Sequence, residues 1–126
     1  MNLKKLLRNL LLRWQAGDLD EKGVHREAVA HEASPPWTQD EWPEYPDADP
    51  RSIVVEVLSQ LSMLNAQWIT RDDIPAILSF LDSTPGEEKQ AWQNWEKYWE
   101  ELDYRKRREE IAGNPFYSQS GPFVDE

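Results

Sequence analysis

The chain of 126 residues contains no cysteine. This absence excludes disulfides, cysteine-based zinc sites, iron–sulfur clusters and a cysteine nucleophile. A cysteine-free chain is compatible with a reducing compartment. The length is that of one ordinary domain, and it is sufficient to bury a hydrophobic core without cross-links. We therefore expect a single domain over residues 1–126.

Long hydrophobic runs are also lacking. Residues 3–14 begin with a mixture of leucines and bases that resembles the start of a signal peptide, but Arg8 and Asn9 interrupt the apolar run and no small-residue cleavage site follows. No stretch approaches the roughly 18 apolar residues that a membrane-spanning helix needs. The sequence therefore predicts a cytoplasmic protein with no signal peptide and no membrane contact.

Histidine and glycine are scarce, with two and five residues respectively. His25 and His31 are six positions apart, so on a helix they point about 240° apart and cannot share a metal ion. No glycine-rich phosphate-binding loop is present. Adjacent acids such as Asp72 and Asp73 diverge by about 100° on a helix, and we interpret them as solvated acids facing the helix dipole. We expect no catalytic residue, cofactor or metal site, and no enzyme. Carboxylates that folding brings together are the alternative.

The charge is acidic and unevenly distributed. The formal net charge is −10, from 24 acids against 14 bases, yet residues 1–17 carry four bases and no acid. Residues 18–50 carry ten acids and two bases. Direct binding of nucleic acid requires a basic footprint for the phosphates, so it is not expected. A localised acidic surface instead favours a basic protein partner and accelerates encounter with it, although acidity can also serve solubility alone.

The apolar residues recur mainly at steps of three and four, which is typical of amphipathic helices. No strand pattern persists for five residues, and no internal repeat is visible. The pattern predicts an all-α bundle of about five helices. The expected helices span residues 3–15, 21–33, 50–65, 70–81 and 84–111.

The expected helix ends carry recognisable capping residues. Gly17 is placed as a C-cap glycine, and Asp20 and Asp49 as N-caps. Thr70 with Asp73, and Thr84 with Glu87, have the spacing of capping boxes. The basic run 105–108 falls near the end of the last helix, where cations suit the dipole and where Glu101 pairs with Arg105 at i, i+4. Contact with RNA or phosphate is the alternative function of that run.

Tryptophan is unusually frequent, with seven residues. Trp14, Trp92, Trp95 and Trp99 lie on apolar helical stripes, which predicts that they belong to the core. Trp68, in contrast, is expected in or near a loop.

Residues 34–50 form the expected functional segment. Five prolines alternate there with aromatic and acidic residues, and no helical or strand period survives, which predicts a long loop. Large aromatic anchors with a negative rim are typical of a protein interface. The predicted partner-binding residues are Trp37, Asp40, Glu41, Trp42, Glu44, Tyr45, Asp47 and Asp49. The alternative is that these aromatics pack onto the bundle. Residues 114–126 are expected to form an extended tail.

Several stretches together resemble small bacterial immunity proteins of polymorphic-toxin and contact-dependent growth inhibition systems. They are residues 13–17 (RWQAG), 53–65 (IVVEVLSQLSMLN), 69–81 (ITRDDIPAILSFL), 84–86 (TPG) and 92–104. The resemblance implies that the chain binds a cognate toxin C-terminal domain, commonly a basic nuclease, in the cytoplasm. We expect a monomer or weak homodimer. The competing hypotheses are an acidic adaptor or regulatory domain that binds another cytosolic protein, and an enzyme built on convergent carboxylates.

Overall fold

A computed structural model of the protein describes residues 3–32 and 49–117. Within these ranges the chain is entirely helical and contains no strand, which confirms the all-α class. Seven α-helices and one 3₁₀-helix are present, rather than five helices, because two of the expected helices are each divided. The elements are α1 (Leu3–Ala16), α2 (Glu21–Glu32), α3 (Pro50–Ser62), α4 (Leu64–Gln67), η1 (Arg71–Asp73), α5 (Ile74–Leu81), α6 (Glu88–Glu100) and α7 (Tyr104–Ile111).

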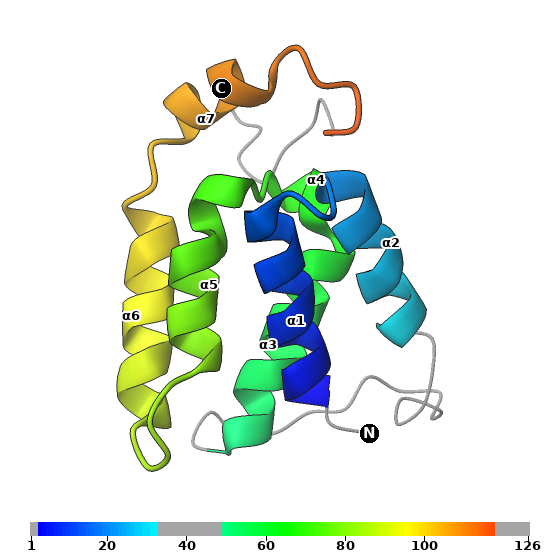
Figure 1. Ribbon diagram of the computed structural model, residues 1–126. Helices are drawn as coiled ribbons and strands as arrows, with labels where there is room; N and C mark the ends of the chain where they lie inside the picture. Colours follow the sequence, from blue (N-terminus) through cyan, green and yellow to red (C-terminus); the bar gives the residue numbers. More distant parts are fainter. Residues whose placement is uncertain (1–2, 33–48, 118–126) are drawn as a thin grey trace.

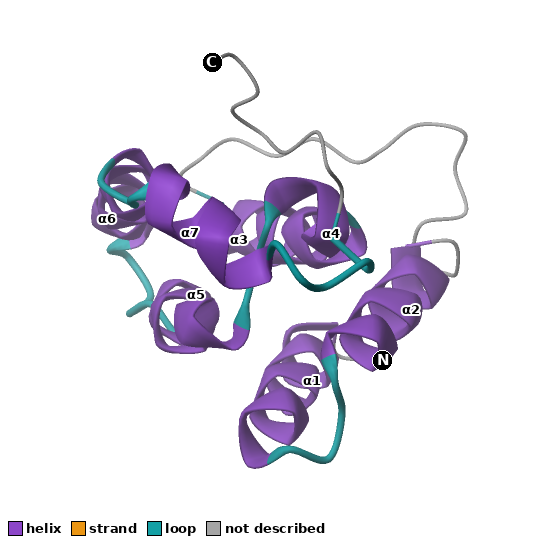
Figure 2. Cartoon of the chain, turned by 90° about the horizontal axis from the view of Figure 1, so that it is seen from above, coloured by secondary structure: helices purple, strands orange, loops and turns teal. Residues whose placement is uncertain are grey.

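The helices form a bundle in which α1 packs against α2, α3 and α5. Helix α6 packs on α5 and α3, on the side away from α2 (Figure 2). Helix α7 crosses one end of the bundle instead of lying alongside it (Figure 1). The core is built from buried aliphatic and aromatic side chains contributed by every helix, with α1, α3 and α5 supplying most of them.

Helix α1 follows its predicted pattern closely. Its buried face consists of Leu7, Leu10, Leu11 and Trp14. Gly17 adopts φ = 88°, the left-handed conformation that glycine tolerates without a Cβ penalty, and so ends the helix as expected. The basic face of α1 forms ion pairs with acidic side chains from elsewhere in the fold: Arg8 to Asp82 (3.1 Å) and Arg13 to Glu27 (3.6 Å).

Helix α2 begins at the predicted cap, because Asp20 Oδ1 accepts a hydrogen bond from the backbone N–H of Gly23 at 2.9 Å. Val24 and Ala28 are fully buried. Val29 lies about 100° around the helix from Ala28 and is 41% exposed. In the part of the chain that the structure describes, no helix is long and apolar enough to span a bilayer.

The first division separates α3 from α4 at Met63. The Met63 backbone has φ −118° and ψ 26°, outside the helical region, and its side chain is 45% exposed. Five residues later the chain turns sharply at Trp68, which adopts φ 58° and ψ 42°. A residue with a Cβ is disfavoured in this left-handed conformation. The side chain of Trp68 is nevertheless buried, so burial offsets the backbone cost, and Trp68 belongs to the core.

The second division, at residues 101–103, separates α6 from α7. Asp103 is the N-cap of α7, and its side chain accepts from the backbone N–H of Lys106 at 3.0 Å. The expected Glu101–Arg105 pair on one continuous helix is therefore wrong, because the helix ends between the two residues.

The two predicted capping boxes had different outcomes. The box of Thr70 and Asp73 is confirmed. The box of Thr84 and Glu87 does not form, since α6 begins at Glu88. The Glu88 carboxylate instead accepts from the backbone N–H of Gly86 at 3.1 Å.

Replacing Asp103 tests the division between α6 and α7. Because Asp103 caps α7, Asp103→Ala should destabilise the protein by about 1 kcal/mol, measured by urea denaturation. Asp103→Asn, which keeps a capping acceptor, should stay close to wild type. A continuous helix would give the opposite sign, because alanine is a better residue than aspartate inside a helix. A stabilising Asp103→Ala would therefore contradict the division.

Candidate functional site

The predicted interface lies almost entirely outside the described residues. This applies to Trp37, Asp40, Glu41, Trp42, Glu44, Tyr45 and Asp47. Asp49 is described, and it caps α3 by accepting from the backbone N–H of Arg51 at 2.9 Å. Its carboxylate also pairs with the Arg51 guanidinium at 2.7 Å. Hydrogen bonds from the Arg51 side chain and backbone lower the pKa of Asp49. Asp49 therefore has a structural role at the start of α3.

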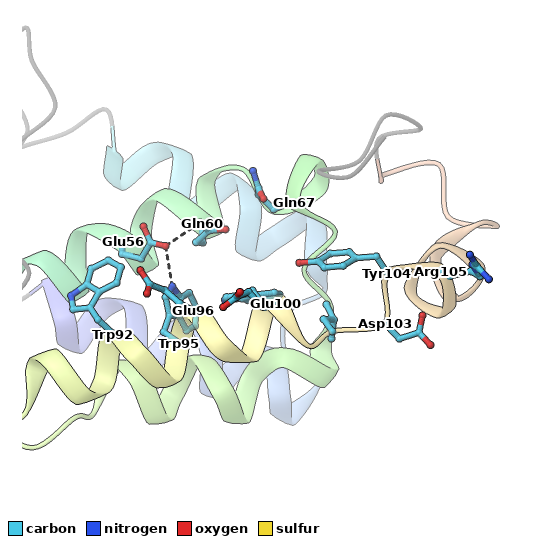
Figure 3. A pocket seen from close by; sticks show the side chains of 12 residues that line it. Glu56, Gln60, Gln67, Trp92, Trp95, Glu96, Glu100, Asp103, Tyr104 and Arg105 are labelled. Carbon is cyan, nitrogen blue, oxygen red and sulfur yellow. Dashed lines mark hydrogen bonds between the residues drawn. The ribbon is translucent and has the colours of Figure 1, made fainter. Parts of the chain in front are cut away.

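An open groove lies between α3 and α6 (Figure 3). Its volume is about 1100 Å³. One wall is a stripe on α6, where Trp92, Trp95 and Trp99 recur at steps of three and four and so share a face. The opposite wall includes Glu56 and Gln60, one turn apart on α3. The remaining lining residues are Gln67, Glu96, Glu100, Leu102, Asp103, Tyr104 and Arg105.

The α6 wall rests on an aromatic cluster. Trp95 is buried and stacks on Phe80, with ring centroids 4.2 Å apart and planes 8° apart. Trp92 meets the same Phe80 edge to face at 5.1 Å, and Trp99 meets Trp95 edge to face at 5.3 Å. Trp92 and Trp99 are only half-buried. The sequence correctly placed these tryptophans on one stripe, but two of them are shared between the core and the groove.

Indole N–H groups on α6 connect the two walls by hydrogen bonds to acceptors on α3. Trp92 Nε1 donates to Ser52 Oγ at 3.0 Å. Trp95 Nε1 donates to Glu56 Oε2 at 3.0 Å (Figure 3). The acceptors are one turn apart on α3, and the donors are nearly one turn apart on α6. Gln60 Nε2 also donates to Glu56 Oε2, at 3.2 Å. These bonds hold the tryptophan rings and the Glu56 carboxylate in place without any ligand.

The groove is strongly acidic. Four carboxylates line it, from Glu56, Glu96, Glu100 and Asp103, against one guanidinium from Arg105, which gives a formal net charge of −3. An acidic groove with half-exposed indole rings can attract a cation, accept its hydrogen bonds and stack against it. Over residues 3–32 and 49–117, no cluster of histidine, aspartate and glutamate side chains is arranged to hold a metal ion.

A buried ion pair fixes α7 next to this groove. Asp73 is fully buried, and Arg107 is 4% exposed. The guanidinium donates through Nη1 to Asp73 Oδ2 (2.8 Å) and through Nη2 to Asp73 Oδ1 (2.9 Å). Asp73 also accepts from the Tyr98 hydroxyl at 2.5 Å and from the Thr70 backbone N–H at 2.9 Å. Each carboxylate oxygen therefore has two donors, which satisfies its acceptor capacity.

The Arg107 guanidinium also forms a hydrogen bond with the backbone of the sharp turn that precedes η1. Arg107 Nη1 donates to the carbonyl of Trp68 at 2.6 Å, and the Tyr117 hydroxyl donates to the carbonyl of Ile69 at 2.6 Å. Burial opposes the charge on Arg107, but the hydrogen bonds and charge of Asp73 raise its pKa overall. Burial, together with the hydrogen bond to Asp73, raises the pKa of Tyr98. Arg107 therefore stays charged and Tyr98 stays a donor at all physiological pH values.

Sequence reasoning missed this pair. Asp73 was interpreted as solvated and Arg107 as one member of a surface basic run, and the structure shows both interpretations to be wrong. One signal was present: Tyr104, Arg107 and Ile111 lie at steps of three and four, so Arg107 alone of the four bases falls on the inward stripe of α7. Residues 114–117, the start of the expected tail, form a turn that buries Tyr117.

Removing the guanidinium tests the buried pair. Arg107→Met leaves the Asp73 charge buried without its main partner, so it should cost about 3–5 kcal/mol in the free energy of unfolding. Adding Asp73→Asn should recover part of that loss, because it removes the uncompensated charge. The exposed neighbour offers a control, since Arg105→Met should change stability by less than about 0.5 kcal/mol. Urea denaturation measures all three, and a double variant as unstable as Arg107→Met would contradict the charge argument.

No protein-family model, curated protein or solved structure matches this chain. The function must therefore be argued from the groove, the charge distribution and the aromatic residues themselves.

Proposed function

We propose that the protein is a non-catalytic binding domain that captures a basic protein partner in the acidic groove between α3 and α6. The observation that carries this proposal is the combination of a formal net charge of −3 with three tryptophans in one groove of about 1100 Å³. Electrostatic complementarity accelerates encounter with a basic partner, and buried aromatic contacts slow dissociation.

The groove is built as a preformed surface. Its walls are joined by the indole hydrogen bonds to Ser52 and Glu56, and its far end is set by α7, which the pair of Asp73 and Arg107 holds. A surface whose side chains are already ordered loses less conformational entropy on binding. This favours the tight, long-lived capture of one partner.

Within this class, we propose that the protein is an immunity protein whose partner is a cognate toxin domain, acting in the cytoplasm. Support comes from the resemblance of residues 53–65 and 69–81 to such proteins, together with the acidic groove. A basic nuclease domain fits the charge, because its active site must attract phosphates. The sequence of segment 34–50 carries further acidic residues.

A pull-down with the tagged chain from its native host, read by mass spectrometry at low and high salt, tests this function. The expected result is one basic, toxin-like protein that is retained at moderate salt and weakened at high salt. Glu96→Lys should weaken its binding at least about tenfold, since like charges in an interface are costly. Glu109→Lys is the matched control, because Glu109 is exposed on α7 and does not line the groove. Recovery of an unrelated housekeeping assembly would refute the immunity function and favour an adaptor.

The predicted loop interface has its own test against the same partner. Trp42→Ala, or charge reversal of Asp40, Glu41 and Glu44, should weaken binding more than it lowers thermal stability. Calorimetry gives the affinity, and a thermal melt of the free variant gives the stability. If affinity for the partner is unchanged, segment 34–50 is not part of the interface.

A further inference from the structure

One end of the groove has a more specific chemistry than a general negative charge. Trp92, Glu56 and Glu96 line this end, with Glu56 on α3 and the other two on α6 (Figure 3). We propose that this subsite binds the guanidinium of an arginine side chain from the partner protein. This inference rests on the proposed function and names the group that the groove recognises.

The Glu56 carboxylate is oriented before any ligand binds. Its Oε2 accepts two hydrogen bonds, from Trp95 Nε1 at 3.0 Å and from Gln60 Nε2 at 3.2 Å. Two donors on one oxygen fix the plane of the carboxylate and leave Oε1 to accept from a ligand. The half-buried side chain therefore presents a fixed acceptor and does not have to be ordered by the partner.

The Trp92 ring is held just as firmly. Its Nε1 donates to Ser52 at 3.0 Å, and its ring packs edge to face on Phe80 at 5.1 Å. The residue is only partly buried, which leaves some indole surface at the groove next to the carboxylates. Aromatic faces attract cations, and the planar guanidinium can also stack on them.

These two features distinguish arginine from lysine. A guanidinium can donate two hydrogen bonds in its plane to carboxylates while its face lies on a ring, whereas an ammonium is a compact, strongly hydrated point charge. The protein itself contains both arrangements: Arg107 forms a two-point pair with Asp73, and the Arg108 guanidinium lies 5.6 Å from the Trp68 ring centroid. Glu96 supplies a second carboxylate at this end of the groove and so increases its negative charge.

The test uses three flexible glycine–serine peptides that carry three arginines, three lysines or three citrullines. Binding to the full chain is measured by calorimetry and by the indole N–H resonances of Trp92 and Trp95. The arginine peptide should bind about tenfold more tightly than the lysine peptide, because only it can pair and stack together. The citrulline peptide, planar but neutral, should bind most weakly.

Two variants distinguish the arginine subsite from the effect of the groove's overall negative charge. Glu56→Gln keeps an acceptor for Trp95 but removes the charge. The arginine and lysine peptides should then bind this variant with nearly equal affinity. Glu100→Gln removes the same charge farther along α6 (Figure 3), so it should weaken both cationic peptides alike and leave their ratio unchanged. Thermal melts check that each variant is folded.

Equal binding of the arginine and lysine peptides would overturn the inference. So would a preference that survives Glu56→Gln, or the absence of binding by either peptide at millimolar concentration. These results leave the proposed function to be decided by the host pull-down and by Glu96→Lys. If the wild-type chain recovers no basic partner in the pull-down, in contrast, the proposed function itself is refuted.

Discussion

The arrangement of the described chain depends on the buried pair of Asp73 and Arg107. Helix α7 crosses the end of the bundle, and its charged guanidinium reaches inward to a carboxylate at the start of α5. Burying two charges is costly unless every donor and acceptor is used. The carboxylate meets this condition through Tyr98, Thr70 and Arg107. The Nε of Arg107 lies 3.4 Å from Glu110, close enough for an ion pair although without hydrogen-bond geometry.

The pair has a structural consequence for the groove. It joins α6, through Tyr98, and α7, through Arg107, to Asp73 and to the turn at Trp68, which precede Tyr98 by 25 positions or more. Tyr104 and Asp103, which line the groove at the start of α7, are positioned by that attachment. The opposite end of the groove is ordered independently, by the indole bonds from α6 to α3. The groove is thus ordered by two sets of contacts, the polar centre at its α7 end and the indole bonds at its other end.

The sequence predicted the helices well where local signals coincide. In α1 the leucine stripe, Trp14 and the C-cap at Gly17 all agree, and the helix ends within one residue of the prediction. The divisions at Met63 and at residues 101–103 were missed because apolar residues recur on both sides of each break. The chain breaks there for tertiary reasons: Trp68 enters the core, and Arg107 must reach Asp73. Asp73 lies 34 positions before Arg107, and the sign of their pairing in the sequence is the place of Arg107 on the inward stripe of α7.

The candidate site was predictable only in part. The stripe of Trp92, Trp95 and Trp99 was evident, but the residues that make it a groove, Ser52 and Glu56, precede their partners by 40 and 39 positions. Periodicity cannot pair helices across such distances. The stronger sequence signal was the acidic aromatic segment 34–50, which lies outside the described residues except at its end. There, Asp49 is a helix cap, so its type and position are explained without a partner.

The basic face of α1 lies apart from the acidic groove. Lys4, Lys5, Arg8 and Arg13 lie on α1, and α5 lies between α1 and α6 (Figure 1). The ion pairs of Arg8 and Arg13 reduce this positive charge locally without removing its sign at the first helix. The four bases of α1 are therefore kept apart from the four carboxylates that line the groove. For the basic partner proposed above, this separation would concentrate the attraction at the groove, while the α1 face would add repulsion, which favours encounters on the α6 side.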